Sequence, residues 1–333
     1  EKGERMITPL PMFHMNAMAY SLMAMIRVGG CLIALDRFHP ETWWADVVQS
    51  RATCFHYLGI MPTLLMSLEP SLEEKRHSVR FGFGAGIDPK LHSEFEKRFR
   101  IPLVEAWAMT ETGAGAVIAS NTKDRLVGQS CLGRPSQEIE CKIVDEHGNR
   151  VRENIPGELL VRRSCGHPRY GFFSHYYRDP EATAEAWKDG WFHTGDIVRQ
   201  KENGNVFFVD RKKNIIRRSG ENIAALEVES TLLRHPAISS VGVTSVPDPI
   251  RGDEVFAFII TEKPSVKTAI GIMEWCLLEM AYYKAPGFIC FVEELPLTAT
   301  QKIERTEMKK KAMIALGEPS TISTLHLKKR QII

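Results

Sequence analysis

The sequence predicts an α/β protein, with a doubly wound, mostly parallel sheet followed by a compact α+β module. Two observations favour this class. Short apolar runs alternate with longer amphipathic runs up to residue 106, as expected for βαβ units. Near residue 210 an apolar run gives way to a strongly basic segment, after which strand and helix patterns resume. We therefore expect domains at 1–210 and 211–312, followed by a basic tail at 313–333.

The elements expected in the first part follow one another in regular order. Residues 6–11 are predicted to form a buried strand. Residues 17–28 are predicted to form a buried helix, because they are apolar around the full circumference. Gly29 and Gly30 end that helix. We then expect strands at 31–35, 52–58, 80–83 and 103–106, and helices at 40–50, 62–68 and 89–99.

The second part begins after a hairpin. Glu-Asn-Gly-Asn at 202–205 is a turn signal that precedes an apolar strand at 206–209. Residues 219–222 open an amphipathic helix at 223–233, which stops before Pro236. Further along we expect strands at 240–246, 255–261 and 288–292, and helices at 269–281 and 304–315.

The composition argues against several classes of protein. The 333 residues are enough for two domains, and 43 basic against 41 acidic side chains argue against nucleic acid as the main partner. Seven cysteines without a Cys-x-x-Cys pair fit a reducing, cytoplasmic compartment better than a disulfide framework or a zinc site. No apolar run reaches the roughly 20 residues of a membrane span. The basic residues at 309–311 and 328–330 are expected to be solvated.

Sites in doubly wound sheets lie beyond the carboxyl ends of strands, and two such ends carry suggestive residues. The first is the glycine-rich turn at 82–86, which could belong to a dinucleotide-binding fingerprint with Glu105 as the ribose-binding acid. Ile87 occupies the place of the third glycine, which weakens that interpretation. A dinucleotide-binding oxidoreductase is therefore kept only as an alternative. The second strand end is Glu-Ala-Trp-Ala-Met-Thr-Glu at 105–111.

The segment 191–229 is the most informative of the chain. It holds Thr-Gly-Asp at 194–196, expected as a tight turn with an outward carboxylate, then Asp-Arg-Lys-Lys at 210–213 and Gly-Glu-Asn-Ile at 220–223. In this order the motifs resemble those of the adenylate-forming superfamily, which comprises acyl-CoA synthetases, luciferases and peptide-synthetase adenylation domains. Asp210 stands where the family has glycine. The wording of the motifs looks closest to crotonobetaine/carnitine-CoA ligases.

The resemblance implies a nucleotide site in the first part of the chain. Thr110 would bind the α-phosphate, and Glu111 would hold the Mg²⁺ that bridges the ATP phosphates. Asp196 would accept hydrogen bonds from the ribose hydroxyls, and Arg211 would donate to the ribose. The remaining nucleotide-binding residues would be Gly84, Ala85, Glu105, Ala106 and Trp107, with the Trp107 ring in place of the usual tyrosine.

The acyl substrate and the second half-reaction are assigned in the same way. His14 resembles the residue that gates the acyl pocket, and the methyl of Ala108, where the family has glycine, would intrude on that pocket. Lys302 matches the lysine that neutralises charge on the carboxylate and α-phosphate. Lys213 would be the hinge of a rotating C-terminal module. That module would bring its coenzyme A turn, Ser219, Gly220 and Glu221, to the site.

Gly-Glu-Leu at 157–159 and Pro-Glu-Ala-Thr at 180–183 resemble segments of the family's small β-rich subdomain, and the Pro180 segment should open a helix. The family normally has a lysine-containing phosphate loop before residue 6, and no such loop is found, so we expect a fragment that can self-associate. Substrates would be a carboxylate, ATP and coenzyme A. A peptide-synthetase-type adenylation domain and an impaired fragment that only binds nucleotide stay open.

Overall fold

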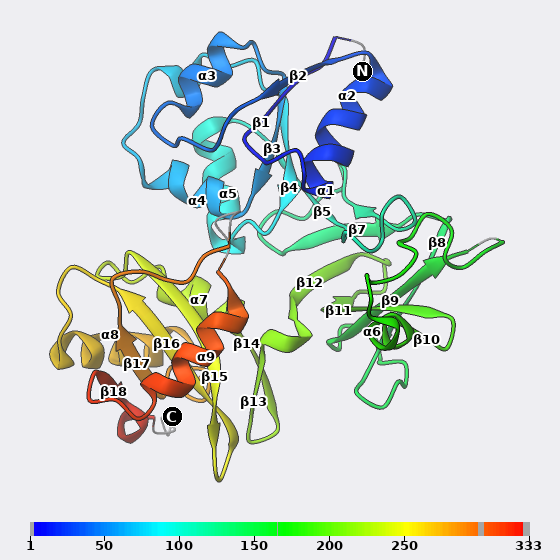
Figure 1. The fold of residues 1–333 in the computed structure, drawn as a ribbon. Coiled ribbons are helices and arrows are strands. Elements are labelled where there is room, and N and C mark those ends of the chain that lie inside the picture. The colour runs from blue at the N-terminus through cyan, green and yellow to red at the C-terminus, as the bar shows by residue number, and fades with distance from the viewer. Residues whose placement is uncertain (1–2, 165, 299–302, 329–333) are drawn as a thin grey trace. The chain divides into compact units, whose positions relative to one another are not determined.

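The computed structural model describes residues 3–164, 166–298 and 303–328. The chain divides into two compact units, Glu1–Phe208 and Val209–Ile333. This division lies two residues before the boundary expected from the sequence. Figure 1 shows the elements of each unit.

The first unit contains the predicted parallel sheet. Its strands lie in the order β2-β1-β3-β4-β5, and all neighbours are parallel. This order is one of the two common arrangements of doubly wound folds. The strands are β1 (Arg5–Thr8), β2 (Cys31–Ala34), β3 (Cys54–Leu58), β4 (Phe81–Ala85) and β5 (Leu103–Trp107).

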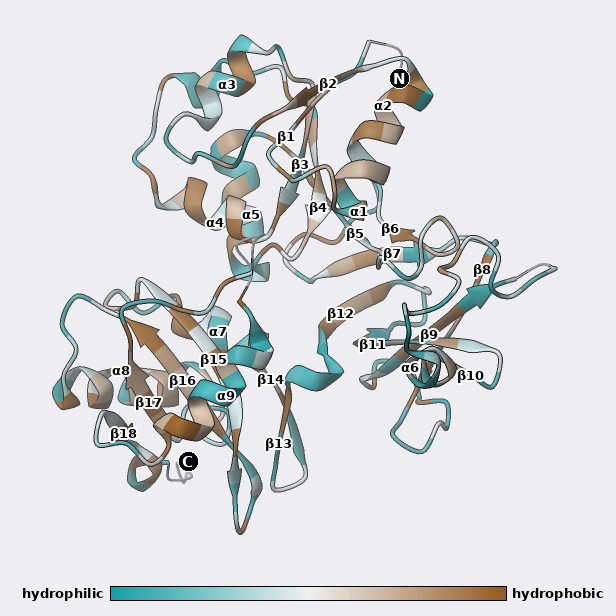
Figure 2. Ribbon diagram, in the orientation of Figure 1, coloured by the Kyte–Doolittle hydropathy of each residue, from teal (hydrophilic) through white to brown (hydrophobic). Residues whose placement is uncertain are grey.

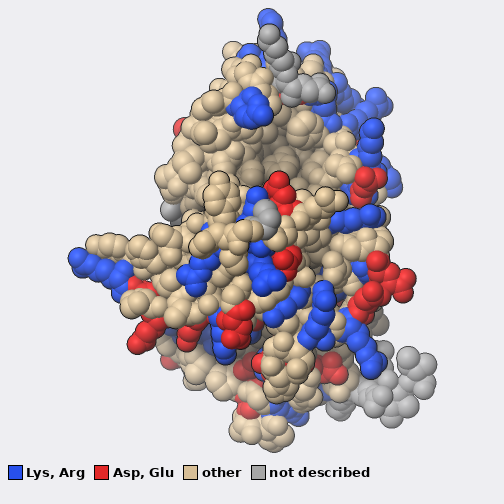
Figure 3. All heavy atoms as spheres, turned by 90° about the vertical axis from the view of Figure 1, so that its right-hand side faces the viewer, with Lys and Arg blue, Asp and Glu red and all other residues tan. Residues whose placement is uncertain are grey.

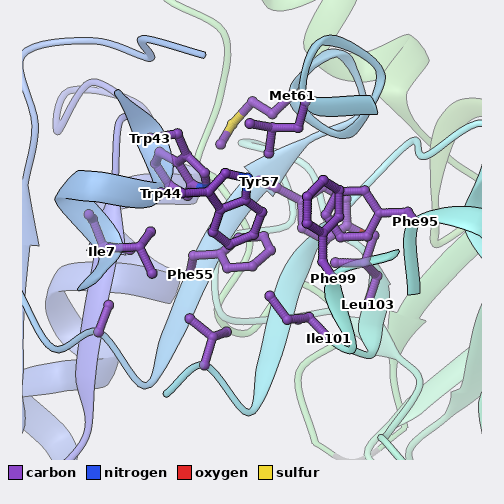
Figure 4. Close-up of a cluster of buried hydrophobic side chains, with 14 of the residues drawn as sticks. Ile7, Trp43, Trp44, Phe55, Tyr57, Met61, Phe95, Phe99, Ile101 and Leu103 are labelled. Carbon is purple, nitrogen blue, oxygen red and sulfur yellow. The ribbon is translucent and has the colours of Figure 1, made fainter. Parts of the chain in front are cut away.

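Helices cover both faces of this sheet, because successive strand residues point to opposite sides. Met6 and Cys54 pack with Met25 of α2 (Ala24–Val28) on one face. Ile7 and Phe55 belong to the larger core on the other face, which includes side chains of α3 (Trp43–Gln49), α4 (Ile60–Ser67) and α5 (Pro89–Phe99). Figure 4 shows the aromatic side chains that fill this second core.

The helix predicted at 17–28 is neither regular nor buried all round. It consists of α1 (Met15–Ala17), a π-helical stretch at Met18–Met23, and α2, and it ends at Gly29 with a φ of 63°. Only one side packs on the sheet, so Met18, Met23 and Ile26 are 45%, 53% and 63% exposed. The apolar circumference therefore did not indicate burial.

An antiparallel part extends the sheet in the order β6-β7-β12-β11-β9-β8, with β10 paired to β11. The predicted hairpin turn at 202–205 is confirmed, since the Lys201 amide donates to the Asn205 carbonyl. Asp179 caps α6 (Pro180–Ala186), as expected for a helix opened by proline. The strands are β6 (Ile118–Ala119), β7 (Cys131–Pro135), β8 (Ile139–Val144), β9 (Gly157–Arg163), β10 (Trp187–Lys188), β11 (Trp191–Gln200) and β12 (Val206–Arg211).

The second unit is an α+β module around a smaller sheet, in the order β14-β13-β16-β17-β18 with β15 paired to β16. Figure 2 shows apolar residues along β15, β16 and β17. The strands are β13 (Ile215–Arg218), β14 (Glu221–Ala224), β15 (Ser240–Asp248), β16 (Gly252–Ile260), β17 (Phe288–Phe291) and β18 (Thr321–Ser323). The helices are α7 (Ala225–Leu232), α8 (Val266–Glu279) and α9 (Arg305–Ala315).

Two expectations for this unit are wrong. Ile223 does not begin a helix, because residues 221–224 pair with β13 as a strand and α7 starts only at Ala225. The residues predicted as a separate basic tail are not separate either, because α9 continues to Ala315 and β18 pairs with β17. Lys328, expected to be solvated, has a side chain that is 2% exposed and pairs with Glu254.

Charges of both signs occupy the surface, and Lys and Arg lie among Asp and Glu over much of the face drawn in Figure 3. The cysteines that the structure describes are free. Within the described ranges, none of the helices combines the length and hydrophobicity needed to span a membrane. The cytoplasmic location stays a prediction.

Candidate nucleotide site

Trp107 and Asp196 meet in the first unit, as expected for parts of one site. The indole Nε1 of Trp107 donates a 2.7 Å hydrogen bond to Oδ2 of Asp196. Both residues are nearly buried, at 5% and 1% exposure. A hydrogen bond to a carboxylate in such surroundings fixes both side chains firmly.

Asp196 does not lie on an exposed tight turn, as the sequence suggested. It belongs to the long strand β11, at an irregularity where the pairing with β9 shifts between His193 and Ile197. Gly195 has a φ of 66°, which suits glycine at a bulge. The Thr194 hydroxyl accepts from the Asp196 amide at 3.0 Å and donates to the Leu159 carbonyl. The bulge therefore turns the carboxylate inward, toward Trp107.

Trp107 was expected to present a flat ring to an adenine. Its ring instead packs into the core of the β-rich part, among residues that include Ile118 and Leu132. Ala106, the preceding residue, is half-buried. The ring thus mainly supports the core, and its N–H group orients Asp196. Stacking of an adenine base on the small exposed edge of the ring stays a prediction.

The glycine-rich turn after β4 is shaped by its neighbours in the fold. A Cβ on Gly84 would lie 2.2 Å from the Tyr57 carbonyl oxygen, so glycine is required there for the approach of β3 and β4. Ala85 is half-buried, and Gly86 is exposed with a φ of 80°. Contact between this turn and the adenine base of a nucleotide stays a prediction.

Glu105 supports that turn from the inside. Its carboxyl group is 4% exposed and accepts a hydrogen bond from the Gly86 amide. Burial raises the pKa of Glu105 to about 8, an effect that the Gly86 hydrogen bond opposes. Direct contact between the Glu105 side chain and a nucleotide stays a prediction, and in this structure the carboxyl group is buried against the Gly86 amide.

The surroundings of Glu105 form a polar network that the sequence did not reveal. His92 of α5 has its Nδ1 3.9 Å from Glu105 and its Nε2 3.0 Å from Glu96. Glu96 also pairs with Arg125 and accepts from the Leu103 amide at 2.9 Å. The one signal of this network in the sequence was the helical spacing of four residues between His92 and Glu96.

Glu111 lies in the loop after β5 and is held by a tyrosine. The Tyr176 hydroxyl donates to Glu111 Oε1 at 3.0 Å, and the Phe173 amide donates to the Glu111 carbonyl at 2.8 Å. Burial and the neighbouring carboxylate raise the pKa of Tyr176 to about 12, so the hydroxyl keeps its proton. Thr110 beside it is exposed. Tyr176 was not identified from the sequence.

Glu111 would supply a single carboxylate to a metal ion that is shared with a ligand. The described ranges contain no group of three or more histidine, cysteine or acidic side chains that could hold a metal ion. Magnesium is commonly bound by one or two carboxylates together with substrate phosphates. The half-buried carboxylate of Glu111 suits that arrangement.

The predicted acyl-pocket residues lie in the connections that follow β1 and β5. His14 precedes α1, and its Nε2 is buried without a hydrogen-bond partner among the described residues. Ala108 follows β5 and is half-buried. Nearby in sequence, the Ser21 hydroxyl lies 2.9 Å from Nδ1 of the buried His56. Burial lowers the pKa of His56 to about 4, so this imidazole is neutral.

In the second unit the predicted hinge is organised by Asp210. Its Oδ1 accepts from the Arg211 amide at 2.6 Å and from Asn214 Nδ2 at 3.2 Å, and its Oδ2 accepts from the Leu226 amide at 3.0 Å. Lys213 is exposed within the single helical turn Lys212–Asn214. Asp210 therefore ties the hinge to the first turn of α7. This explains why an acidic residue can replace the family's glycine.

Ser219 and Gly220 form the tip of the β13–β14 hairpin instead of opening a helix. Their φ angles are 51° and 83°, and Glu221 pairs with Arg218 across the hairpin. A two-residue turn with both central residues in the left-handed region is typical of tight hairpins. Lys302 lies outside the described residues. Arg305 beyond it makes a paired contact with Glu229 of α7, with 2.7 Å between Nη2 and Oε2.

Comparisons with known proteins agree with this arrangement. The model of the AMP-binding enzyme family matches residues 1–171, and that of the AMP-binding enzyme C-terminal domain matches residues 227–302. The first match includes the glycine-rich turn and so replaces the dinucleotide-binding alternative. The predicted resemblance is confirmed.

Two curated relatives are crotonobetaine/carnitine-CoA ligases. That of Citrobacter koseri is 31% identical over 305 residues, which cover 91% of this chain and 58% of the relative. That of Proteus mirabilis is 30% identical over 299 residues, which cover 89% of this chain and 57% of the relative. The chain thus spans less than two thirds of the length of the curated relatives it matches.

Solved structures share the fold. An anthranilate-CoA ligase in complex with anthranoyl-AMP superposes with a TM-score of 0.81 at 23% identity, covering 95% of this chain and 60% of that one. The o-succinylbenzoate-CoA synthetase of Bacillus subtilis, in complex with its acyl-adenylate, superposes with a TM-score of 0.77 at 25% identity, covering 92% and 60%. The predicted fold class is therefore confirmed.

Proposed function

The chain belongs to the AMP-binding enzyme family, and from this membership we propose that it forms part of an ATP-dependent carboxylate-CoA ligase. In the first step a carboxylate oxygen attacks the α-phosphorus of ATP, which gives an acyl-adenylate and releases pyrophosphate. In the second step the coenzyme A thiol attacks the acyl carbon, AMP leaves, and the thiol proton passes to solvent.

The observation that carries this proposal is the Trp107–Asp196 contact. Asp196 is held by a 2.7 Å hydrogen bond on one oxygen, and its strand bulge keeps it in one orientation. A fixed carboxylate accepts hydrogen bonds from the two hydroxyls of a ribose well, because both hydroxyls can donate to it. We assign Asp196 to the ribose of ATP and of the adenylate, together with Arg211.

Thr110 and Glu111 are proposed to lie at the phosphates. A magnesium ion at Glu111 would supply charge neutralisation for the departing pyrophosphate. Tyr176 would keep the Glu111 carboxylate in one orientation through its 3.0 Å hydrogen bond. Lys302 is proposed to neutralise the charge on the carboxylate and α-phosphate. The Ser219-Gly220-Glu221 turn is proposed to meet coenzyme A in the second step.

For the acid substrate we propose a class of compound. The relatives named above act, by their names, on crotonobetaine and carnitine, so a carnitine-like or a fatty carboxylate is the first class to test. His14 and Ala108 are proposed to line its pocket. The buried Nε2 of His14 would gain a hydrogen-bond partner from a polar substrate.

A second candidate is a nucleotide-binding protein without turnover, and the experiment separates the two. The chain is incubated with ATP, Mg²⁺, coenzyme A and a panel of carboxylates that includes crotonobetaine, carnitine and fatty acids. AMP and acyl-CoA are measured by mass spectrometry, with Asp196→Ala as the matched control. Acyl-CoA formed by the wild type and strongly reduced in the variant supports a ligase. AMP binding without acyl-CoA from any acid supports the second candidate.

A further inference from the structure

A buried cluster of three charged side chains lies behind the Ser219-Gly220 turn, and neither family model covers all of it. Glu254 of β16 is fully buried, and Arg218 of β13 is 5% exposed. Lys328, with a side chain that is 2% exposed, follows a short helical turn at Leu325–Leu327. Lys328 lies beyond residues 227–302, the segment that matches the C-terminal domain model.

Both oxygens of Glu254 are used. Oε2 accepts from Arg218 Nε at 2.7 Å. Oε1 accepts from Lys328 Nζ and from the Val255 amide, the latter at 2.9 Å. The ammonium of Lys328 also donates to the Tyr283 carbonyl at 3.3 Å. A buried carboxylate that accepts hydrogen bonds on both oxygens holds its partners in one geometry.

Arg218 connects this cluster to the turn, because it is the last residue of β13 before Ser219. The turn itself is strained, since Ser219 is a non-glycine residue with a φ of 51°. Hydrogen bonds to the β15–β16 hairpin help to hold it. The Ser219 amide donates to the Arg251 carbonyl at 2.8 Å, and the Arg217 amide donates to Asp253 at 3.1 Å. The buried side chain of Arg218, bonded to Glu254, adds an anchor directly beside the hairpin tip.

The segment that carries Lys328 is itself well fixed. The Thr324 hydroxyl donates to the Pro286 carbonyl at 2.6 Å, and its amide donates to the Gly287 carbonyl at 3.0 Å. A Cβ on Gly287 would lie 2.5 Å from Glu254 Cγ, so the chain passes directly over the Glu254 side chain. The same Cβ would lie 2.8 Å from Leu325 Cδ2, so the C-terminal segment packs at Gly287 beside Glu254.

We propose that Lys328 is a positioning residue for the Ser219-Gly220 turn, acting through Glu254 and Arg218. A role of Lys328 in coenzyme A binding rests on the proposed function of that turn, whereas the positioning of the turn by Lys328 does not. Burial lowers the pKa of Lys328 to about 8, while Glu254 opposes this shift, so the Lys328 ammonium keeps its proton at neutral pH.

The positioning is tested by amide hydrogen exchange of the 333-residue chain, followed in a peptide that covers residues 215–224. Lys328→Met should raise exchange in this peptide about tenfold, because the hairpin tip opens more often when its anchor loosens. Lys328→Arg, which keeps the charge, should restore much of the protection. Lys310→Met is the matched control, since Lys310 is 70% exposed on α9 and does not contact the cluster.

Coenzyme A affinity tests the functional part separately by calorimetry. Lys328→Met should weaken binding about five- to tenfold, whereas AMP affinity and the melting temperature of the first unit should be unchanged. Unchanged exchange at 215–224, or exchange that rises equally across β15 and β16, would overturn the positioning role. Absence of coenzyme A binding in the wild type would instead contradict the proposed function of the turn. The positioning role of Lys328 would then be decided by the hydrogen-exchange result alone.

Discussion

The indole of Trp107 and the carboxylate of Asp196, 89 residues apart in the chain, are joined by a hydrogen bond of 2.7 Å. Trp107 is the last residue of β5 in the parallel sheet, and Asp196 lies on β11, the longest strand of the antiparallel part. The contact links the two parts of the first unit at the place where the nucleotide is proposed to bind. A change in either residue should therefore affect both stability and ligand affinity.

Trp107→Phe removes the N–H donor and leaves a buried carboxylate with one partner fewer. We expect a loss of stability about 1.5–3 kcal/mol larger than in a matched Trp→Phe variant. Trp187→Phe is that match, because Trp187 is also 5% exposed and its Nε1 has no hydrogen-bond partner among the described residues. Urea unfolding of both variants measures the difference. Equal losses would mean that the Trp107 hydrogen bond contributes nothing.

Glu105 should make stability depend on pH. Its pKa of about 8 in the folded chain lies above the ordinary value near 4.5, so the folded state binds more protons between these values. By linkage, stability is greatest below about pH 4.5 with respect to this group and falls as pH rises toward 8. Glu105→Gln should remove this fall and raise the melting temperature at pH 8.

The measurement is a set of thermal unfolding curves from pH 5 to 9. Glu94→Gln serves as control, because Glu94 is an exposed residue of α5, the helix that carries His92 and Glu96. His92, Glu96 and Arg125 face the same interior and are left unchanged in both variants. If the melting temperature of Glu105→Gln falls with pH as steeply as that of the wild type, the fall is caused by one of those groups and not by Glu105.

Arg305→Met should destabilise the second unit strongly. It would leave Glu229, which is 4% exposed, without the guanidinium that pairs with both of its oxygens. Removing one partner of a buried pair typically costs about 3–5 kcal/mol. Lys310→Ala, which breaks an exposed pair with Glu307, should cost less than about 1 kcal/mol. Guanidinium unfolding monitored for the second unit compares the two, and similar small losses would refute the prediction.

The two half-reactions should be separable in the proposed ligase. Lys302→Ala should abolish most adenylate formation, which is measured by pyrophosphate exchange, but spare thioester formation from a supplied acyl-adenylate. Lys213→Pro should do the reverse, because proline fixes φ at the hinge and restricts the residue before it. If both variants lose both steps equally, Lys213 does not act as the hinge of a rotating module.

The sequence was sufficient for the fold class, because strand and helix periodicities were clear and the motifs fell in family order. The sequence was not sufficient where tertiary contacts determine the local structure. The Asp196 turn became a bulge because β11 pairs with β9 on both sides of it. Ile223 joined a strand because β13 was available as a partner. Tyr176 and Lys328 have no local pattern, since their partners lie 65 and 74 residues away.

The most direct test of the nucleotide site is calorimetric titration of AMP into the chain and into Asp196→Ala. Hydrogen bonds to a charged group are worth about 1.5–3 kcal/mol, so the variant should bind AMP at least about tenfold more weakly. Asp189→Ala, in the exposed turn before β11, should bind AMP as the wild type does. Equal affinities of the wild type and Asp196→Ala would remove Asp196 from the site and contradict the assignment.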